Sequence, residues 1–165
     1  PYTFELNKDF NFSAAHFIPS EDAGKCMRTH GHTYFVNLTI VGDTLDHNGF
    51  LINFSELKRL VHDQFDHYLL NDLPQFKDKS PSTEIVAQTI FEIVQAHLNE
   101  YDNKPKCVQV YLRETQVMLS IVQRRINNAF KNTSFRNFWS YYSRRRTSYR
   151  TKNNVCPHSR MRLSL

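Results

Sequence analysis

Two segments near the start of the chain alternate apolar and polar side chains, the pattern of strands with one buried face. One face of the first segment carries Tyr2, Phe4, Leu6, Phe10, Phe12, Ala14 and His16. One face of the second carries His30, His32, Tyr34, Val36, Leu38 and Ile40. In an antiparallel pair, the end of the first strand lies beside the start of the second. The sequence therefore predicts paired strands over residues 2–16 and about 32–41.

Three histidines, His16, His30 and His32, fall on these predicted inner faces where the two strands meet. Three imidazoles with an open fourth position are typical of catalytic zinc, whereas structural zinc is usually closed by four protein ligands. The pattern therefore predicts a Zn²⁺ site. Cys26 lies in the turn between the strands, and a nearby metal would make its thiol a better base or nucleophile. An inert buried cysteine is the alternative.

The hydrophobic period becomes helical after the turn at Asn48-Gly49. One stripe carries Phe54, Leu57, Val61 and Phe65, with Asn53 or Ser55 as the cap. A second helix follows a loop, with Ser80 or Ser82 as its cap and Val86, Ile90, Ile93, Val94 and His97 on its inner side. Val108, Val110 and Leu112 alternate as a third strand, and a fourth is expected next. The order ββααββ predicts an α+β fold, with two helices on one face of a four-stranded antiparallel sheet.

Charge divides the chain into two parts. Residues 1–114 carry 10 Lys and Arg and all 16 Asp and Glu, whereas residues 115–165 carry 11 Lys and Arg and no acidic residue. We therefore expect one acidic domain over residues 1–115 and a basic, aromatic tail. Three widely spaced cysteines do not form a disulfide framework, which favours a reducing, cytoplasmic setting. No apolar run is long enough to cross a membrane.

Five short motifs together resemble one family. They are Ser13-Ala14-Ala15-His16, Cys26-x3-His30-Gly31-His32, Asp66-His67-x-x-Leu70-Asn71, Pro81-Ser82-Thr83-Glu84 and Arg113-Glu114-Thr115. Taken alone, the carboxylate and imidazole at 66 and 67 mean little, since adjacent residues on a helix point apart, and Glu114 could be a solvated edge residue. In this order they resemble the 6-pyruvoyl-tetrahydropterin synthase / 6-carboxy-tetrahydropterin synthase family, and most closely its bacterial branch that serves queuosine synthesis.

The resemblance implies a tunnelling fold, in which the sheets of several identical subunits form a barrel with sites between chains. It also implies a zinc-dependent carbon-carbon lyase that converts 7,8-dihydroneopterin triphosphate to 6-carboxytetrahydropterin, acetaldehyde and triphosphate. The implied roles are zinc ligation by His16, His30 and His32, proton removal by Cys26, proton relay by His67 with Asp66, pterin binding by Glu114, and lining of the pterin pocket by Thr83 and Glu84. Lys25 and Arg28 are candidates for binding the triphosphate.

The resemblance ends after Thr115, where the family continues Glu-Thr-Pro-Thr-Ser-aromatic. Codons can be chosen for the residues from Gln116 onward so that the reading frame two bases further on encodes a different peptide. That peptide is S-Y-V-V-Y-R-P-K-E-D-K followed by a stop, and it resembles the final strand of the family. Residues 139–165, read one base on, resemble the start of 7-carboxy-7-deazaguanine synthase. We therefore interpret 116–126 as an altered final strand and 127–165 as an out-of-frame, disordered tail. Sequencing the gene tests this hypothesis.

Three other functions remain open on the sequence alone. The tail mixes Arg with Trp and Tyr, as single-strand nucleic-acid binders do, although such tails are more often solvated extensions. A 6-pyruvoyl-tetrahydropterin synthase or an aldolase-like relative would share the zinc site, but Cys26 argues against relatives with Glu there. An inactive zinc-binding domain is the third alternative, because the altered end could weaken the last strand.

Overall fold

The computed structural model describes residues 1–114 and 120–123. Its strands are β1 (Phe4–His16), β2 (His30–Gly42), β3 (Lys106–Arg113) and β4 (Ser120–Gln123). Its helices are α1 (Phe54–Phe65) and α2 (Thr83–Leu98), with short 3₁₀ turns η1 (Glu21–Met27), η2 (Leu70–Asp72) and η3 (Pro74–Phe76). The strands form one antiparallel sheet in the order β1-β2-β3-β4.

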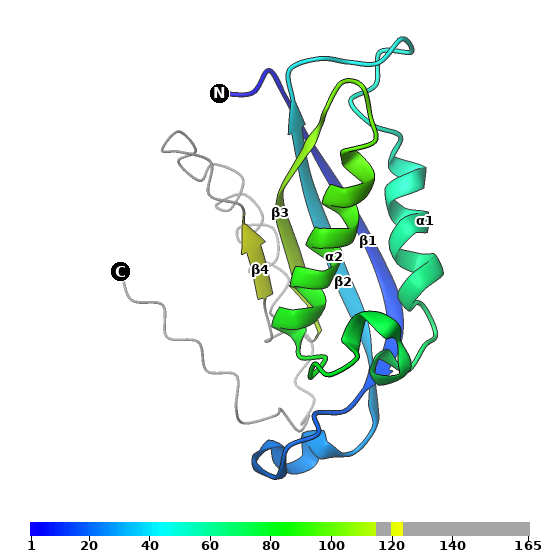
Figure 1. The fold of residues 1–165 in the computed structure, drawn as a ribbon, viewed down its shortest axis with the longest axis vertical. Coiled ribbons are helices and arrows are strands. Elements are labelled where there is room, and N and C mark those ends of the chain that lie inside the picture. The colour runs from blue at the N-terminus through cyan, green and yellow to red at the C-terminus, as the bar shows by residue number, and fades with distance from the viewer. Residues whose placement is uncertain (115–119, 124–165) are drawn as a thin grey trace, which may run out of the picture.

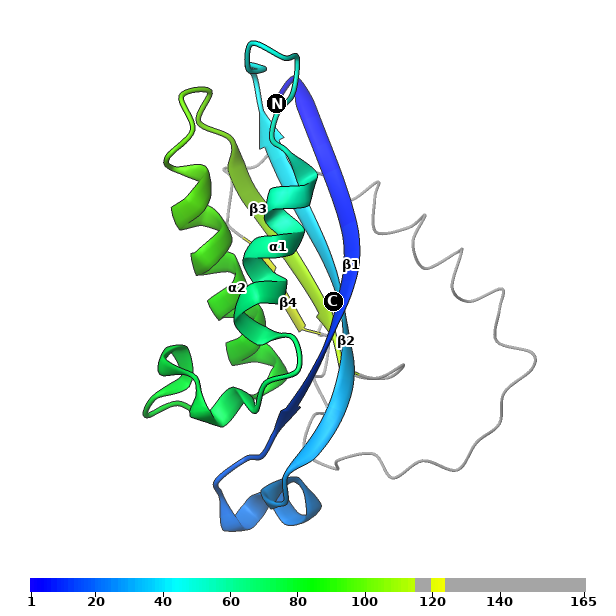
Figure 2. The same cartoon turned by 90° about the vertical axis from the view of Figure 1, so that its right-hand side faces the viewer.

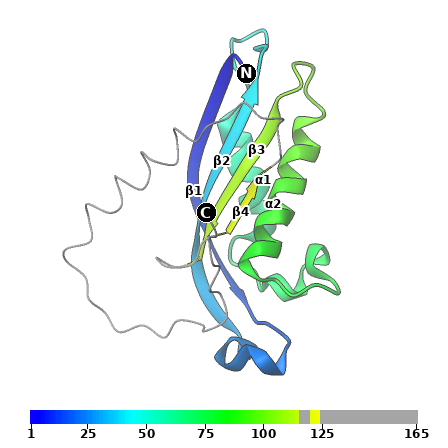
Figure 3. The same cartoon turned by 90° about the vertical axis from the view of Figure 1, so that its left-hand side faces the viewer.

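Both helices lie on the same face of the sheet, as Figures 1 and 2 show from two directions. The opposite face carries no helix of the described chain (Figure 3). The expected α+β class with an antiparallel sheet and helices is confirmed. The β1–β2 hairpin is longer than β3 and projects past both helices, with η1 at its tip (Figure 1).

The core lies between the sheet and the helices. Phe12 and Tyr34 are paired across β1 and β2, and their rings stack with centroids 4.9 Å apart. Residues of α1 at helical spacing, Leu57, Val61 and Phe65, are fully buried in the same hydrophobic cluster. Burying each such side chain contributes about 1.5–3 kcal/mol, so the apolar stripe holds the helix on the sheet.

Each helix begins at a side-chain cap that the sequence offers. Oδ1 of Asn53 accepts a hydrogen bond from the backbone N–H of Ser55 at 3.0 Å, which caps α1. Oγ of Ser82, rather than that of Ser80, accepts from the N–H of Ile85 and caps α2. The caps satisfy N–H groups that the first helical turn leaves without partners.

The alternation predicted for β3 is wrong at its start. Residue Val108 is half-buried, and Cys107 takes the core position instead. The cause is a bulge, since Thr39 pairs with Gln109 and Ile40 pairs with Cys107, which leaves Val108 without a partner in the register. An extra residue in one strand shifts which face its neighbours occupy. From Gln109 onward the alternation holds, and Val110 and Leu112 are fully buried.

Two further predictions concern membrane crossing and the segment that follows Thr115. No helix among the described residues is both long and apolar enough to cross a membrane. Residues 120–123 form β4, which lies within the segment predicted as an altered final strand. The segment 127–165, predicted as an out-of-frame tail, lies outside the described residues.

Candidate metal centre

The strand register brings the three histidines together. His16 pairs with His30, and Ala14 pairs with His32, so all three rings lie on the core face at the end of the hairpin nearest η1. The ring centroids are 4.6 Å apart for His16 and His30, 4.9 Å for His30 and His32, and 5.2 Å for His16 and His32.

Two backbone carbonyls orient two of these rings. Nδ1 of His16 is 2.7 Å from the carbonyl oxygen of Pro81, and Nδ1 of His30 is 2.7 Å from that of Arg28. A carbonyl only accepts, so Nδ1 is the donor in both contacts and each Nε2 is directed into the cluster. Backbone carbonyls commonly fix the tautomer of metal-binding histidines in this way.

Glu114 joins the cluster from the end of β3. Its side chain is 7% exposed, which excludes the solvated edge position that the sequence left open. Oε1 lies 2.8 Å from Nε2 of His16 and 3.1 Å from Nε2 of His32, and Oε2 accepts a hydrogen bond of 2.9 Å from the hydroxyl of Thr83. The β3 alternation of Val110 and Leu112, continued by two residues, could have placed Glu114 on the core face.

The electrostatics of the cluster favour a bound cation. One potential ligand atom from each of His16, His30, His32 and Glu114 lies within 4.8 Å of the others. Nε2 of His16 faces both Nε2 of His30, at 3.1 Å, and the Glu114 carboxylate, so potential ligand atoms converge on one point. Three imidazole nitrogens and a carboxylate oxygen are ligands that suit Zn²⁺.

The ring of His32 supports the same conclusion. Its Nε2 is buried and makes no hydrogen bond within the described chain, because the contact with Glu114 lacks hydrogen-bonding geometry. Burial lowers the pKa of His32 more than the Glu114 carboxylate raises it, and His16 and His30 lower it further. The neutral imidazole that metals bind is therefore favoured.

Glu114 itself stays ionised. Burial pushes its pKa upward, but the His16 and His32 rings and the Thr83 hydroxyl together outweigh burial, and the net pKa is lowered. The neighbouring Tyr34 hydroxyl lies 3.5 Å from Oε1, and burial followed by the Glu114 charge raises its pKa. Tyr34 was not among the predicted site residues, although its place two positions after His32 puts it on the same face.

Asp66 and His67 contact each other, contrary to the expectation that adjacent residues on a helix point apart. Helix α1 ends at Phe65, and His67 has a left-handed backbone with φ of 63°. Oδ2 of Asp66 consequently reaches Nδ1 of His67 at 2.9 Å, while Oδ1 accepts from the N–H of Ser13 at 2.8 Å. The side chain of His67 is 82% exposed, outside the buried histidine cluster.

The remaining predicted residues lie at different depths. Thr83 is buried beside Glu114, whereas Glu84 is exposed on the first turn of α2. Cys26 is half-buried in η1, and Lys25 and Arg28 are exposed close by. The structure has the Cys26 sulfur in a disulfide, so the predicted catalytic thiol requires the reduced form. Cys107 is a free, buried thiol.

The acid dependence of stability should report the Asp66 carboxylate. Its pKa is lowered from 3.8, mainly by the Ser13 N–H and further by His67 and His62, against a smaller opposing effect of burial. A lowered pKa stabilises the fold above the unfolded-state value, and this contribution is lost as the pH falls through the folded-state value. We expect Asp66→Asn to lower the free energy of unfolding by about 1 kcal/mol at neutral pH. The variant should also lose less stability than the wild type as the pH falls, which urea unfolding from about pH 3 to 7 would measure. Asp63→Asn, on exposed α1 surface, is the control, and parallel curves for wild type and Asp66→Asn would contradict the assignment.

Comparison with known proteins identifies the class of this fold and site. The family model for 6-pyruvoyl tetrahydropterin synthase matches residues 5–125. The chain therefore belongs to this family. The match extends to residue 125, beyond Thr115, the last residue of the motifs quoted above, and the matched range includes β4.

Three relatives define the similarity further. The chain is 60% identical over 119 residues to the 6-carboxy-5,6,7,8-tetrahydropterin synthase of Bacillus subtilis (strain 168), covering 70% of this chain and 82% of that protein. It is 38% identical over 94 residues to the enzyme of the same name from Synechocystis, covering 52% and 70%. The solved structure of Caenorhabditis elegans 6-pyruvoyl tetrahydropterin synthase matches with a TM-score of 0.61 and 25% identity, covering 74% of this chain and 96% of that one.

Proposed function

We propose that this chain is a 6-carboxy-5,6,7,8-tetrahydropterin synthase. It would convert 7,8-dihydroneopterin triphosphate to 6-carboxytetrahydropterin, acetaldehyde and triphosphate, in the branch that leads to queuosine. The observation that carries the proposal is the convergence of three imidazole Nε2 atoms on one point, in a chain 60% identical to a protein of that name. The proposed setting is the cytoplasm, and the proposed assembly is a homo-oligomer whose sheets form a barrel.

His16, His30 and His32 would hold Zn²⁺. When bound, the ion polarises oxygen atoms of the substrate and makes the adjacent C–H groups more acidic. The backbone carbonyls of Pro81 and Arg28 keep two of the rings in the ligating tautomer. This proposal is supported by the buried Nε2 of His32, which makes no hydrogen bond within the described chain.

Glu114 would bind the pterin. A carboxylate can accept two parallel hydrogen bonds from the guanidine-like edge of a pterin, as it does from arginine. The lowered pKa supports this role because it keeps the group anionic. The Thr83 hydroxyl fixes one oxygen of that carboxylate, and Glu84 is proposed to line the same pocket.

Cys26 and His67 would move protons. The Cys26 thiolate would take a proton from the substrate side chain, and His67, oriented by Asp66, would relay it. The 2.9 Å contact between Asp66 Oδ2 and His67 Nδ1 supports the relay, because it leaves Nε2 of His67 for the substrate. The exposure of His67 fits a site completed by a second subunit.

Product analysis tests the function. The full chain, reduced and loaded with Zn²⁺, is incubated with 7,8-dihydroneopterin triphosphate, and acetaldehyde is measured with alcohol dehydrogenase and NADH. We expect acetaldehyde and 6-carboxytetrahydropterin in equal amounts. A 6-pyruvoyl product without acetaldehyde would make the chain a 6-pyruvoyl-tetrahydropterin synthase, and no turnover would leave a zinc-binding domain without this activity.

A thiol variant adds a test of the proton-transfer role. Cys26→Ser should lower kcat by about a hundredfold or more, the range of a general base, with metal content unchanged. Cys107→Ala is the matched control, because burial raises the pKa of that thiol to about 12 and it cannot act as a base at neutral pH. Equal activity of Cys26→Ser and the wild type would contradict the assignment.

A further inference from the structure

Asp66 lies between two histidines. Its Oδ1 is held by the backbone N–H of Ser13, while Oδ2 faces Nδ1 of His67 at 2.9 Å and Nδ1 of His62 at 3.5 Å. His62 is four residues before Asp66, on the last turn of α1, and its side chain is three-quarters buried. The same carboxylate oxygen therefore serves both rings.

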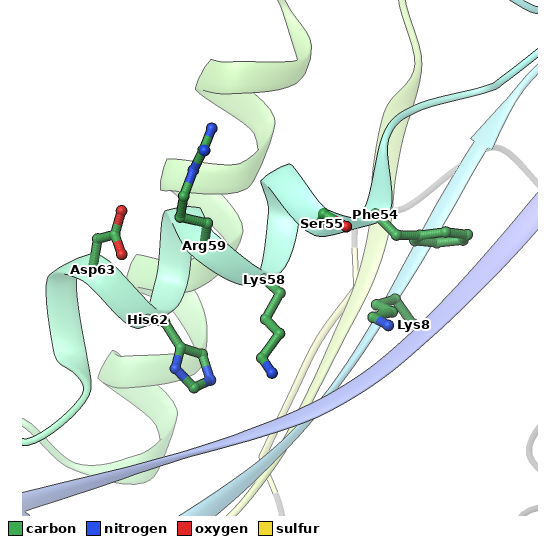
Figure 4. Close-up of a pocket in the computed structure, with 7 residues that line it drawn as sticks. All are labelled: Lys8, Phe54, Ser55, Lys58, Arg59, His62 and Asp63. Carbon is green, nitrogen blue, oxygen red and sulfur yellow. The ribbon is translucent and has the colours of Figure 1, made fainter. Parts of the chain in front are cut away.

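The other side of the His62 ring is fixed to the sheet. Nε2 of His62 lies 2.5 Å from the carbonyl oxygen of Asn11 on β1, and the ring projects from α1 toward that strand (Figure 4). It lies at one end of a groove of about 260 Å³ that is also lined by Lys8, Phe54, Ser55, Lys58, Arg59 and Asp63. Both ring nitrogens therefore face oxygen atoms, one on the sheet and one on Asp66.

The backbone at His67 needs this support. A left-handed conformation is unfavourable for a residue with a side chain, and it persists only where the surrounding contacts fix it. The N–H of His67 donates to the Ser13 carbonyl at 2.6 Å, which fixes its backbone against β1. The ring still depends on Asp66 for its orientation, and Asp66 has His62 on its other side.

We propose that His62 is a positioning residue, which holds Asp66 against β1 so that one carboxylate oxygen addresses Nδ1 of His67. The inference rests on the proposed function, in which His67 relays a proton. His62 acts from outside the site, through Asp66, and does not touch the substrate. The pKa of Asp66, lowered first by Ser13 and then by His67 and His62, agrees with a carboxylate held among donors.

Steady-state kinetics of the Zn²⁺-loaded full chain test the proposal. We expect His62→Ala to lower kcat about tenfold, since misplacing a catalytic group slows the chemical step, with KM and metal content unchanged. His62→Gln, which keeps an N–H donor for Asn11, should recover most of kcat. Asp63→Asn, in the same groove, is the control and should match the wild type. Unchanged kcat in His62→Ala would overturn the proposal.

A double-mutant cycle separates positioning from general destabilisation. If His62 acts through Asp66, His62→Ala should reduce kcat less than about twofold in the Asp66→Asn background, because interacting residues are non-additive. Full additivity of the two losses would overturn the proposal. So would loss of metal or of the folded circular dichroism spectrum in both His62→Ala and His62→Gln.

An imidazole ¹⁵N spectrum tests the same contact without turnover. In the wild type we expect His67 to carry its proton on Nδ1, and in His62→Ala we expect a mixture of tautomers. An unchanged His67 signal in His62→Ala would overturn the positioning role. If the wild-type chain turned over no pterin while His67 still responded to His62, the proposed function would fail and the positioning role would stand.

Discussion

His32→Ala should contain less than a tenth of the wild-type metal and lose about a thousandfold or more in kcat/KM. The physical reason is that a bound divalent ion supplies several kcal/mol of charge stabilisation, and each 1.36 kcal/mol is about tenfold in rate. His32 is the most informative of the three ligands to replace. The rings of His16 and His30 also bond to backbone carbonyls, so their loss would disturb the loops as well.

Metal content by mass spectrometry and kcat/KM measured on the same samples check this prediction. The matched control is His47→Ala, an exposed histidine in the segment between β2 and α1. It should keep both metal and activity. Full metal occupancy in His32→Ala, or equal losses in His47→Ala, would contradict a centre built on the three clustered rings.

The second large effect is expected for Glu114→Gln. Two hydrogen bonds to a charged carboxylate contribute about 1.5–3 kcal/mol each, so their loss should lower kcat/KM by about a hundredfold to ten-thousandfold. The amide is nearly the same size, and it leaves the three imidazoles in place. We therefore expect metal content to stay near that of the wild type. Much of the fall in kcat/KM should come from a higher KM.

This variant also separates two roles for Glu114. Its Oε1 lies close enough to His16 and His32 to serve as a fourth ligand rather than as a pterin anchor. Titration with Zn²⁺ in the absence of pterin decides between them. A weakened affinity in Glu114→Gln would show a ligand role and contradict the anchor role. Thr83→Val, which removes only the hydroxyl that bonds Oε2, should weaken pterin binding less.

The sequence predicts the fold well where one physical pattern dominates. The alternation ending at His16 and beginning at His30 specifies the register, because a slip by one residue would turn every core side chain outward. The stripe of Leu57, Val61 and Phe65 likewise predicts which side of α1 is buried. These patterns involve residues that are close together in the chain, so one sequence is enough to predict them.

The sequence predicts poorly where the backbone departs from a regular pattern. The bulge at Val108 has no signal in an alternating apolar segment, so the predicted apolar face began with Val108 instead of Cys107. The left-handed residue His67 follows a helix without a glycine to mark it, and the contact with Asp66 was therefore not expected on local grounds. The ring of His62 contacts the backbone carbonyl of Asn11, which is far away in the chain. A local hydrophobic pattern cannot predict such a contact.

The candidate ligands come from β1, from β2 and from the residue that follows β3, and the carbonyls that orient two of them come from two loops. In the unfolded chain these groups are far apart, so an ion would bind the native state almost exclusively. By mass action, free ion at about one hundred times its dissociation constant would then raise the free energy of unfolding by about 2.7 kcal/mol. Chelation would thus reduce resistance to heat and proteolysis together with any activity, coupling the supply of the ion to the lifetime of the chain.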